Sequence, residues 1–371
     1  MIARAFDPSG QPDRMLRGAL WIMTGIVVVL AVRDLLAAYP VGVDVEIPLR
    51  AARRWLDGGQ PYLAASFQAP VGPDLPFFYP PFVLPVIAPL VLLPGGLVVA
   101  GWLAAGVAAA AWTCRRLSIP WRWLPFVLLW PPFFEGLIGG NIQVVLFAAF
   151  VGLLYRRPAA KAAFNPTERL VGEDSRPAWL DGLLAVVNGA MKPAQAHPWF
   201  LVLRRRPRAA LLGAGIVVIV IAISLVLTGP GLWFDWFAQL ARGSDPDWPL
   251  GGAGLTHGLP ASASVLLAAA TMIAALALPQ RGAVAWLGIL MIVGSPSLRM
   301  FGLLLLLPAM LVVRREVALV AALSVATYTM LGLWLGVAVV GIALAAGSRW
   351  PAWLEPGGPT QAATTDVARK Q

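Results

Sequence analysis

The chain has 371 residues, of which 59% are hydrophobic and only 12% are charged. Its mean hydropathy of +0.76 excludes an ordinary soluble domain. The net charge of +10 does not indicate nucleic acid, because the arginines stand in short clusters between apolar runs, which is the positive-inside pattern of membrane proteins. The single cysteine, Cys114, excludes an internal disulfide and a cysteine-based metal site.

The apolar runs predict an all-α polytopic membrane protein. At roughly 20 residues for each pass, the chain has room for about ten to twelve transmembrane helices. Residues 1–15 are polar and basic, which predicts a cytoplasmic N-terminus and an outward first helix over residues 16–38. We expect one transmembrane domain over residues 16–346, a first outer loop over residues 39–78, and a disordered polar tail over residues 347–371.

The first outer loop concentrates polar residues in an otherwise apolar chain. It holds two closely spaced carboxylates, Asp44 and Glu46, and residues 48–57 project as an amphipathic helix with three arginines on its polar face. Pro48 favours the first turn of this helix, and we expect the helix to lie flat at the outer interface. Either its arginines contact the phosphates of lipids or of a lipid-linked substrate, or the helix is only an anchor.

The remaining apolar runs leave one ambiguity of topology. If Arg115 and Arg116 are cytoplasmic, an odd number of crossings separates them from the first outer loop, yet two runs lie there. Either the run over residues 79–93 enters the membrane only partly, or this arginine pair breaks a rule that is statistical. The apolar runs cover residues 79–93, 97–113, 121–135, 141–155, 179–203, 209–228, 260–279, 283–294, 301–313 and 317–346.

With this topology the isolated polar residues gather on one side of the membrane. A transporter keeps its ionisable groups near the bilayer midplane, whereas an enzyme of the outer leaflet would place them at the extracytoplasmic face. The residues expected at this face include Asp44, Glu46, Tyr79, Glu135, Asn141, Gln143, Lys192, His257 and Arg299.

Several ordered stretches resemble glycosyltransferase family 87, polyprenyl-phosphate-sugar-dependent membrane enzymes of the GT-C class that include mycobacterial mannosyltransferases. The resemblance covers roughly residues 20–310. It rests on Asp44 and the helix after it, "GGQPY", "FFYPPFVLPVIAPLVLLP", "GGNIQVVLFAAF", "WLDGLLAVVNGAMKPAQAHPWFLVLRRRPRAA" and, more weakly, "SPSLRM". It implies a GT-C-like helical bundle that transfers a sugar, mannose being the commonest in the family, from a polyprenyl-phosphate carrier to a lipid or glycan hydroxyl at the outer face of the membrane.

That reaction assigns roles to particular residues. An inverting single displacement requires a general base, for which a carboxylate is the usual choice, and we assign Asp44; without the resemblance, Asp44 caps the helix or lies in a solvated loop. The leaving phosphate requires cations. Lys192, in an apolar Met-Lys-Pro break, and Arg299, after Ser-Pro, are the candidates. The alternative for Lys192 is that it reaches the interface beside Asp181 or Glu135.

Five further residues are possible contributors to substrate binding. Glu46 lies beside Asp44, and Tyr79 shapes the floor of the site or the start of the next helix. Asn141 and Gln143 bind sugar hydroxyls, or Asn141 caps the following helix. His257 orients the acceptor or contacts phosphate, or it is an incidental loop histidine.

No cofactor is expected. The Asp-x-Glu pattern at Asp44 and Glu46 lacks a third ligand, so a divalent metal is not expected, and the chain has no phosphate-binding Gly-rich loop for a nucleotide-sugar donor. Two other classes stay open. A flippase or transporter of lipid-linked sugars would move its substrate without breaking a bond, and a non-catalytic assembly protein of the envelope would need neither Asp44 nor Lys192.

Overall fold

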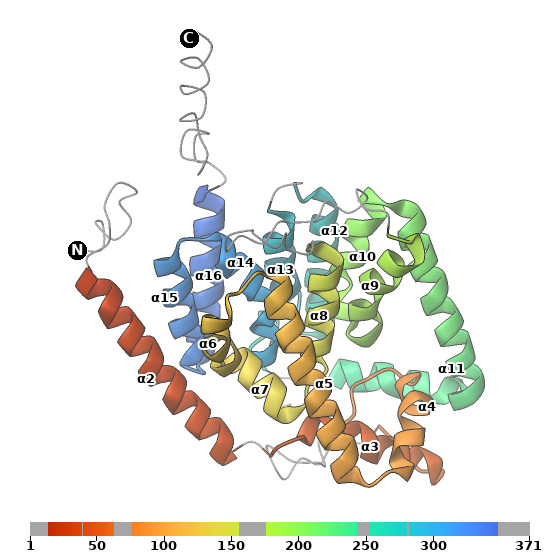
Figure 1. The fold of residues 1–371 in the computed structure, drawn as a ribbon. Helices are drawn as coiled ribbons and strands as arrows, with labels where there is room; N and C mark the ends of the chain where they lie inside the picture. The colour runs from red at the N-terminus through yellow and green to blue at the C-terminus, as the bar shows by residue number, and fades with distance from the viewer. Residues whose placement is uncertain are drawn as a thin grey trace, which may run out of the picture.

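The structure is a computed structural model, and it describes residues 14–38, 40–62, 76–155, 176–242, 252–279 and 282–347. Its regular elements are all helices in these ranges (Figure 1). The predicted cytoplasmic N-terminus and C-terminal tail fall almost entirely outside them. The helices are α2 Arg14–Ala38, α3 Val43–Leu56, α4 Val83–Ile87, η1 Ala88–Leu92, α5 Gly95–Arg116, η2 Trp121–Trp123, α6 Leu124–Leu129, α7 Pro131–Gly139, α8 Gln143–Leu154, α9 Ala178–Met191, η3 Pro193–Gln195, α10 His197–Arg205, α11 Pro207–Arg242, α12 Ala261–Ala277, α13 Ala283–Val293, η4 Met300–Leu306, α14 Leu307–Val312, α15 Arg315–Ala326 and α16 Met330–Gly347.

The helices form an all-α polytopic membrane protein, as the sequence predicts. Three described helices, α5, α11 and α16, are long and apolar enough to cross a membrane, and six shorter apolar segments accompany them. Large apolar side chains remain uncovered on the outer surfaces of α2 and α11, where Ile22 is 66% and Val226 is 86% exposed. Such surfaces are stable in lipid, which offers them hydrocarbon contact.

The segment after the first loop is shorter than the sequence suggests. Residues 83–92 form one turn of α-helix and a 3₁₀ segment, α4 and η1, with a combined length of roughly 18 Å. A hydrocarbon core is about 30 Å thick, so α4 and η1 cannot cross it. This favours the first of the two topological alternatives, in which residues 79–93 enter the membrane only partly.

Two other expectations about helix boundaries are wrong. The interfacial helix α3 begins at Val43, not at Pro48, because Gly42 adopts the left-handed conformation (φ 76°) that starts it and Pro48 lies inside it. The run over residues 317–346 is a hairpin of α15 and α16, which pack along each other and are separated by a turn at Thr327–Thr329.

Helix α11 bends sharply where the sequence predicts the start of an outer loop. Gly229 has a non-helical conformation (φ 77°, ψ 156°) followed by Pro230, a residue that suits the start of a helix. The second half of α11 therefore continues in a new direction beneath the bundle, beside α3 and α4 (Figure 1). Trp236 from this half donates a hydrogen bond to the carbonyl of Phe78 at 2.9 Å, and Gln60 bonds Asp235 at 2.8 Å.

A separate apolar cluster packs α3 and the first loop against the second half of α11. It includes Val43, Ile47, Tyr62, Phe77 and Trp236, so it joins α3, the first loop and the second half of α11. A tilted contact between the rings of Tyr62 and Phe77 and an edge-on contact between those of Phe77 and Tyr79 add to the burial. The amphipathic helix is thus held in place by packing.

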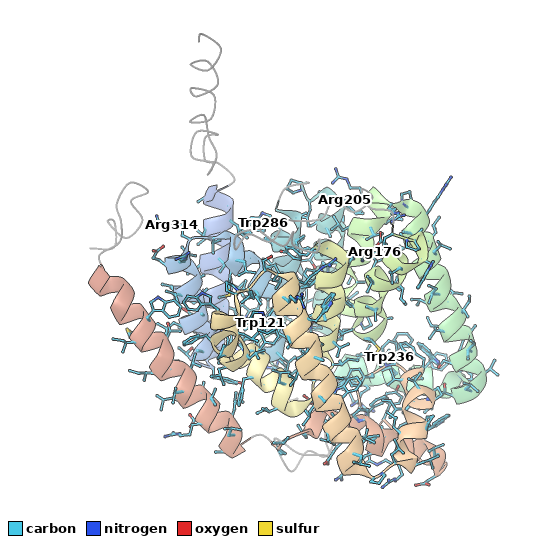
Figure 2. All side chains as sticks on the ribbon, viewed as in Figure 1. Trp121, Arg176, Arg205, Trp236, Trp286 and Arg314 are labelled. Carbon is cyan, nitrogen blue, oxygen red and sulfur yellow. The ribbon has the colours of Figure 1, made fainter. Side chains whose placement is uncertain are left out.

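The end of the bundle opposite to α3 and α4 carries several arginines (Figure 2). Arg176, Arg205 and Arg314 lie at that end, while Trp236 lies at the end of α3 and α4 (Figure 2). The fully buried carboxylate of Asp181 accepts a bond from Arg206 at 2.5 Å, and Arg176 lies 3.7 Å from it. This ion pair fixes one end of α9, whose other end carries Lys192.

Candidate functional site

Asp44 lies in the first turn of α3, at the face that meets the bundle. Helix α3 starts there because Gly42 in its left-handed conformation donates its N–H to the carbonyl of Ile138 at 2.7 Å. A side chain on Gly42 would collide with Val99, at 2.4 Å. Asp44 accepts a hydrogen bond from the Asn141 amide at 3.0 Å, so its carboxylate points to the turn between α7 and α8.

A path of hydrogen bonds connects Asp44 to Lys192. Asn141 Oδ1 accepts from the backbone N–H of Gln143 at 2.9 Å, and Gln143 Oε1 accepts from Lys192 Nζ at 2.8 Å. Gln195 also bonds the Gln143 side chain, at 3.2 Å. Asn141 therefore holds the start of α8 through the Gln143 N–H, as the capping alternative predicts, and it also contacts Asp44.

Lys192 is held at the break between α9 and η3. Its backbone is extended (φ −138°, ψ 93°) and Pro193 follows, so the break that the sequence predicts at Lys-Pro is present. The ammonium lies 4.9 Å from the centre of the Phe301 ring, a favourable cation–π distance. An ammonium has three donors, and its bond to Gln143 uses one of them.

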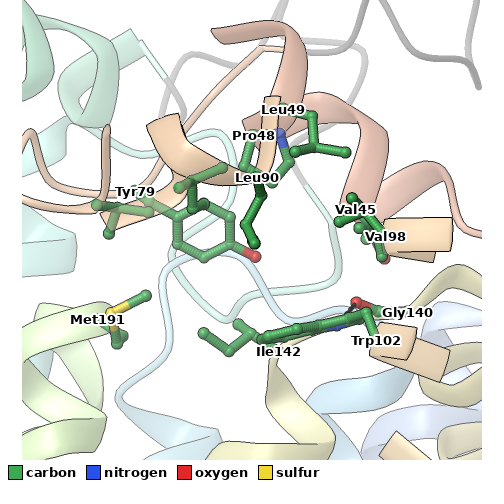
Figure 3. Close-up of a pocket in the computed structure, with 13 residues that line it drawn as sticks. Val45, Pro48, Leu49, Tyr79, Leu90, Val98, Trp102, Gly140, Ile142 and Met191 are labelled. Carbon is green, nitrogen blue, oxygen red and sulfur yellow. Dashed lines mark hydrogen bonds between the residues drawn. The ribbon is translucent and has the colours of Figure 1, made fainter. Parts of the chain in front are cut away.

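A pocket of about 480 Å³, part of it open to the surroundings, lies beside Asp44 (Figure 3). Val45, Pro48 and Leu49 of α3 form one side, and Trp102, Gly140 and Ile142 form the opposite side. Of the described residues that line it, only Asp44 and Tyr79 have strongly polar side chains. The other lining residues are Val83, Ile87, Leu90, Val98 and Met191.

Tyr79 extends its ring into the pocket (Figure 3). Its backbone carbonyl accepts a bond from the Tyr62 hydroxyl at 2.8 Å, which attaches the loop to the start of α4. Burial, and then the negative charge of Asp44, raise the pKa of the Tyr79 phenol well above its ordinary value. The phenol is therefore a protonated hydrogen-bond donor at neutral pH.

Close backbone contacts set the width of the pocket. Gly140, at φ 71°, ends α7, and its carbonyl accepts from the Trp102 indole at 2.7 Å. A Cβ atom on Gly140 would stand 2.5 Å from Val45. Only glycine permits α3 and the α7–α8 turn to approach this closely.

The charges of four elements meet near the pocket. The Asp44 carboxylate interacts electrostatically with Lys192, with Tyr79 and with Glu135 of α7, and Arg299 at the start of η4 interacts with Glu135. The structure thus brings Asp44 and Lys192 toward one region, to which Arg299 is connected through Glu135. Glu135 is a member of this cluster that was not assigned a role from the sequence; a lone carboxylate in the apolar run "PPFFEGLIGG" was the available signal.

Of the candidate residues, only Asp44 and Tyr79 line the pocket, and the described lining does not include Glu46, Asn141, Gln143, Lys192, His257 or Arg299. Glu46 turns to Arg50 one helical turn on, 3.6 Å away, and both side chains are substantially exposed. The His257 backbone N–H bonds the Gly254 carbonyl at 3.1 Å. Within the described ranges, no group of three or more His, Cys, Asp or Glu side chains forms a potential metal site.

Comparison with known proteins gives a consistent result. A family model described as glycosyltransferase family 87 matches residues 77–249, which include α4 to α11, Tyr79 and Lys192 but neither Asp44 nor Arg299. The chain is 27% identical, over 249 residues, to the polyprenol-phosphate-mannose-dependent alpha-(1-2)-phosphatidylinositol mannoside mannosyltransferase of Mycobacterium tuberculosis. That match covers 60% of this chain and 54% of the relative, so the chain spans about half the length of the curated relative that it matches. No solved structure matches the chain. The protein therefore resembles glycosyltransferase family 87, as its sequence predicts.

Proposed function

We propose that this protein is a membrane glycosyltransferase of GT-C-like architecture. It moves a sugar, mannose by analogy with its relative, from a polyprenyl-phosphate carrier to a hydroxyl of a lipid or glycan. The observation that carries the proposal is the path from Asp44 through Asn141 and Gln143 to Lys192. It joins a carboxylate and an ammonium from distant segments beside one pocket.

Asp44 acts as the general base in this proposal. The acceptor hydroxyl gives its proton to the Asp44 carboxylate while its oxygen forms a bond to the anomeric carbon of the sugar. The bond from that carbon to the phosphate oxygen breaks on the opposite face, and its electron pair stays on the phosphate oxygen. Because attack and departure take place on opposite faces, the configuration inverts. The Asn141 amide, 3.0 Å from the carboxylate, holds Asp44 in one orientation.

The leaving group is a lipid phosphate, whose negative charge grows as the bond breaks. Lys192 and Arg299 stabilise this charge, and fixed cations in a water-poor site are effective for that purpose. Gln143 supports this assignment because it holds the ammonium in place at 2.8 Å. Since the two cations balance the leaving charge, the reaction in this proposal needs no divalent metal.

The apolar wall of the pocket fits a lipid-linked donor. Leu49, Leu90, Val98 and Trp102 surround a space that opens beside α3, and an isoprenoid chain finds hydrocarbon contact there. Tyr79 adds a hydrogen-bond donor at the polar end. A nucleotide-sugar donor has no hydrocarbon chain that could pack against this apolar wall.

In this proposal the site faces the extracytoplasmic side; the position of Arg176, Arg205 and Arg314 at the end of the bundle opposite to α3 and α4 (Figure 2) supports that orientation. Cysteine labelling tests this sidedness. In a Cys114→Ser background, a membrane-impermeant maleimide added to intact cells should label Arg53→Cys in α3 and should not label Arg208→Cys at the start of α11. The opposite pattern would reverse the orientation.

The activity is tested with purified protein in liposomes, a synthetic polyprenyl-phosphate mannose and a membrane lipid extract as acceptor. Mass spectrometry should detect a glycosylated lipid. Movement of the donor between leaflets without bond cleavage would identify a flippase instead. If neither movement of the donor nor a glycosylated product is detected, the class that remains is a non-catalytic assembly protein.

A further inference from the structure

Glu135 and Tyr328 form a buried pair that the proposed chemistry does not use. The Tyr328 hydroxyl, from the turn between α15 and α16, donates a short hydrogen bond to Glu135 Oε2 on α7. The two residues are 193 positions apart in the chain. Glu135 is only 7% exposed, whereas Tyr328 is 42% exposed, so the pair has one buried and one open side.

The backbone of Tyr328 is held in an unfavourable conformation. Its φ of 58° lies in the left-handed region, which is strained and which bulky residues rarely adopt. The neighbouring turn enforces it: Thr327 Oγ1 donates to the Ser324 carbonyl at 2.7 Å, and the Gly332 N–H donates to Thr329 Oγ1 at 3.0 Å. The turn thus directs the phenol to Glu135 at a local cost.

The second oxygen of Glu135 remains available. Oε2 accepts from Tyr328, and within the ranges that the structure describes no hydrogen bond to Oε1 is formed. A carboxylate oxygen accepts readily from a hydroxyl. Oε1, which has no hydrogen bond within those ranges and belongs to a residue that interacts with the proposed base, can therefore bind a hydroxyl-bearing ligand.

The position of Glu135 identifies which hydroxyl it would meet. Glu135 interacts electrostatically with Asp44 and with Arg299, the proposed base and one of the proposed phosphate ligands. In a single displacement the transferred sugar lies between the base and the leaving phosphate. In the proposed arrangement, Glu135 therefore interacts with groups on both sides of that sugar.

We infer that Glu135, positioned by Tyr328, binds a hydroxyl of the donor's transferred sugar and so contributes to sugar specificity. This inference rests on the proposed function. Asn141 strengthens the placement, because its backbone N–H bonds the carbonyl of Gly136, next to Glu135, at 2.8 Å. The side chain of the same Asn141 contacts Asp44, so one short segment of chain joins the base to the sugar-binding carboxylate.

The test uses the full-length purified protein and a set of synthetic donors, the polyprenyl-phosphate hexose and its monodeoxy analogues. For the wild type, kcat/KM with one monodeoxy donor should be about 10- to 100-fold lower than with the parent hexose donor. The reason is that this analogue lacks the hydroxyl that would donate a hydrogen bond to the charged Glu135 carboxylate. Glu135→Gln should reduce that discrimination to about 2-fold or less, and Tyr328→Phe should weaken it by up to about 10-fold. The control Glu316→Gln, in the same hairpin as Tyr328, should discriminate as the wild type does.

The outcomes separate this inference from the function on which it rests. A wild type that transfers no sugar contradicts the proposed function. A wild type that transfers sugar, with Glu135→Gln retaining full discrimination among the donors, overturns only the inference. A Glu135→Gln variant that melts at a lower temperature but still discriminates among the donors would show that Glu135 only ties α7 to the hairpin of α15 and α16. That result would also overturn the inference. A rise in acceptor KM alone, with unchanged donor discrimination, would do the same.

Discussion

Replacing Asp44 with asparagine removes the proposed base while it keeps most of the local structure. The side-chain oxygen of the variant can still accept the 3.0 Å bond from Asn141, so the contact between α3 and the α7–α8 turn should persist. The variant cannot take a proton from the acceptor. Loss of a general base lowers kcat by about 10²- to 10⁴-fold, which corresponds to about 3 to 5 kcal/mol in the barrier.

The loss of folding stability in Asp44→Asn should be much smaller than this rise of about 3 to 5 kcal/mol in the reaction barrier. Asp44 lies in the first turn of α3, where a negative charge stabilises a helix by about 0.3 to 1 kcal/mol. Glu46 lies in the same turn and has the same relation to the helix, but it pairs with Arg50 at the surface. Glu46→Gln is therefore a matched control for the helix effect, with an expected change in kcat of about 2-fold or less.

The assay measures kcat and KM for sugar transfer by both variants, together with their melting temperatures. We expect Asp44→Asn to lose kcat with little change in donor KM, and to melt within a few degrees of Glu46→Gln. An Asp44→Asn variant that keeps more than half of the wild-type kcat would refute the assignment of the base. Equal losses in the two variants would attribute the effect to α3 and not to proton transfer.

Three further perturbations test the surroundings of the site. Lys192→Met should lower kcat by about 10²- to 10³-fold, partly restored in Lys192→Arg, and unchanged turnover would remove Lys192 from the leaving-group site. Gly140→Ala should reduce both stability and sugar transfer, because the new Cβ would lie 2.5 Å from Val45. Gly58→Ala is the control: Gly58 has a similar φ of 75° but nothing within 4 Å of the new Cβ. A thermal melt of Gly58→Ala therefore measures the backbone cost alone, about 1 to 2 kcal/mol. Gly213→Ala should lower the melting temperature, because its Cβ would approach a carbonyl of α9 at 2.5 Å. The control Gly215→Ala has open space around the new Cβ and should leave the melting temperature unchanged or raise it slightly. Equal melting temperatures for the two variants would contradict the close packing of α9 on α11.

The sequence predicts the broad architecture because hydrophobicity alone decides it. A chain of this composition must bury its backbone polar groups in helices, and the Lys-Pro break after α9 follows from proline chemistry. The start of α3 was missed because a glycine, Gly42, initiates it in a left-handed conformation. The turn that divides residues 317–346 was missed because Tyr328 and its threonine neighbours break the helix through local hydrogen bonds, which leave no mark in hydropathy.

The candidate site was predictable where single residues stand out from their surroundings. Asp44, Lys192 and Arg299 are isolated charges near apolar segments, and isolated charges there require a reason. What joins them was not predictable, because the Asn141–Gln143 path depends on how α3 docks on the α7–α8 turn. The pair of Glu135 and Tyr328 was also missed, because it joins residues 193 positions apart.

The central claim is that a polyprenyl-phosphate sugar loses its sugar to an acceptor at this pocket. The most direct measurement quantifies glycosylated acceptor and released polyprenyl phosphate in one reaction of purified wild-type protein, with Asp44→Asn run beside it. We predict that the two products rise together in a one-to-one ratio in the wild type and that both nearly vanish in the variant. Intact donor after long incubation with wild-type protein, or equal product from Asp44→Asn, would contradict the account.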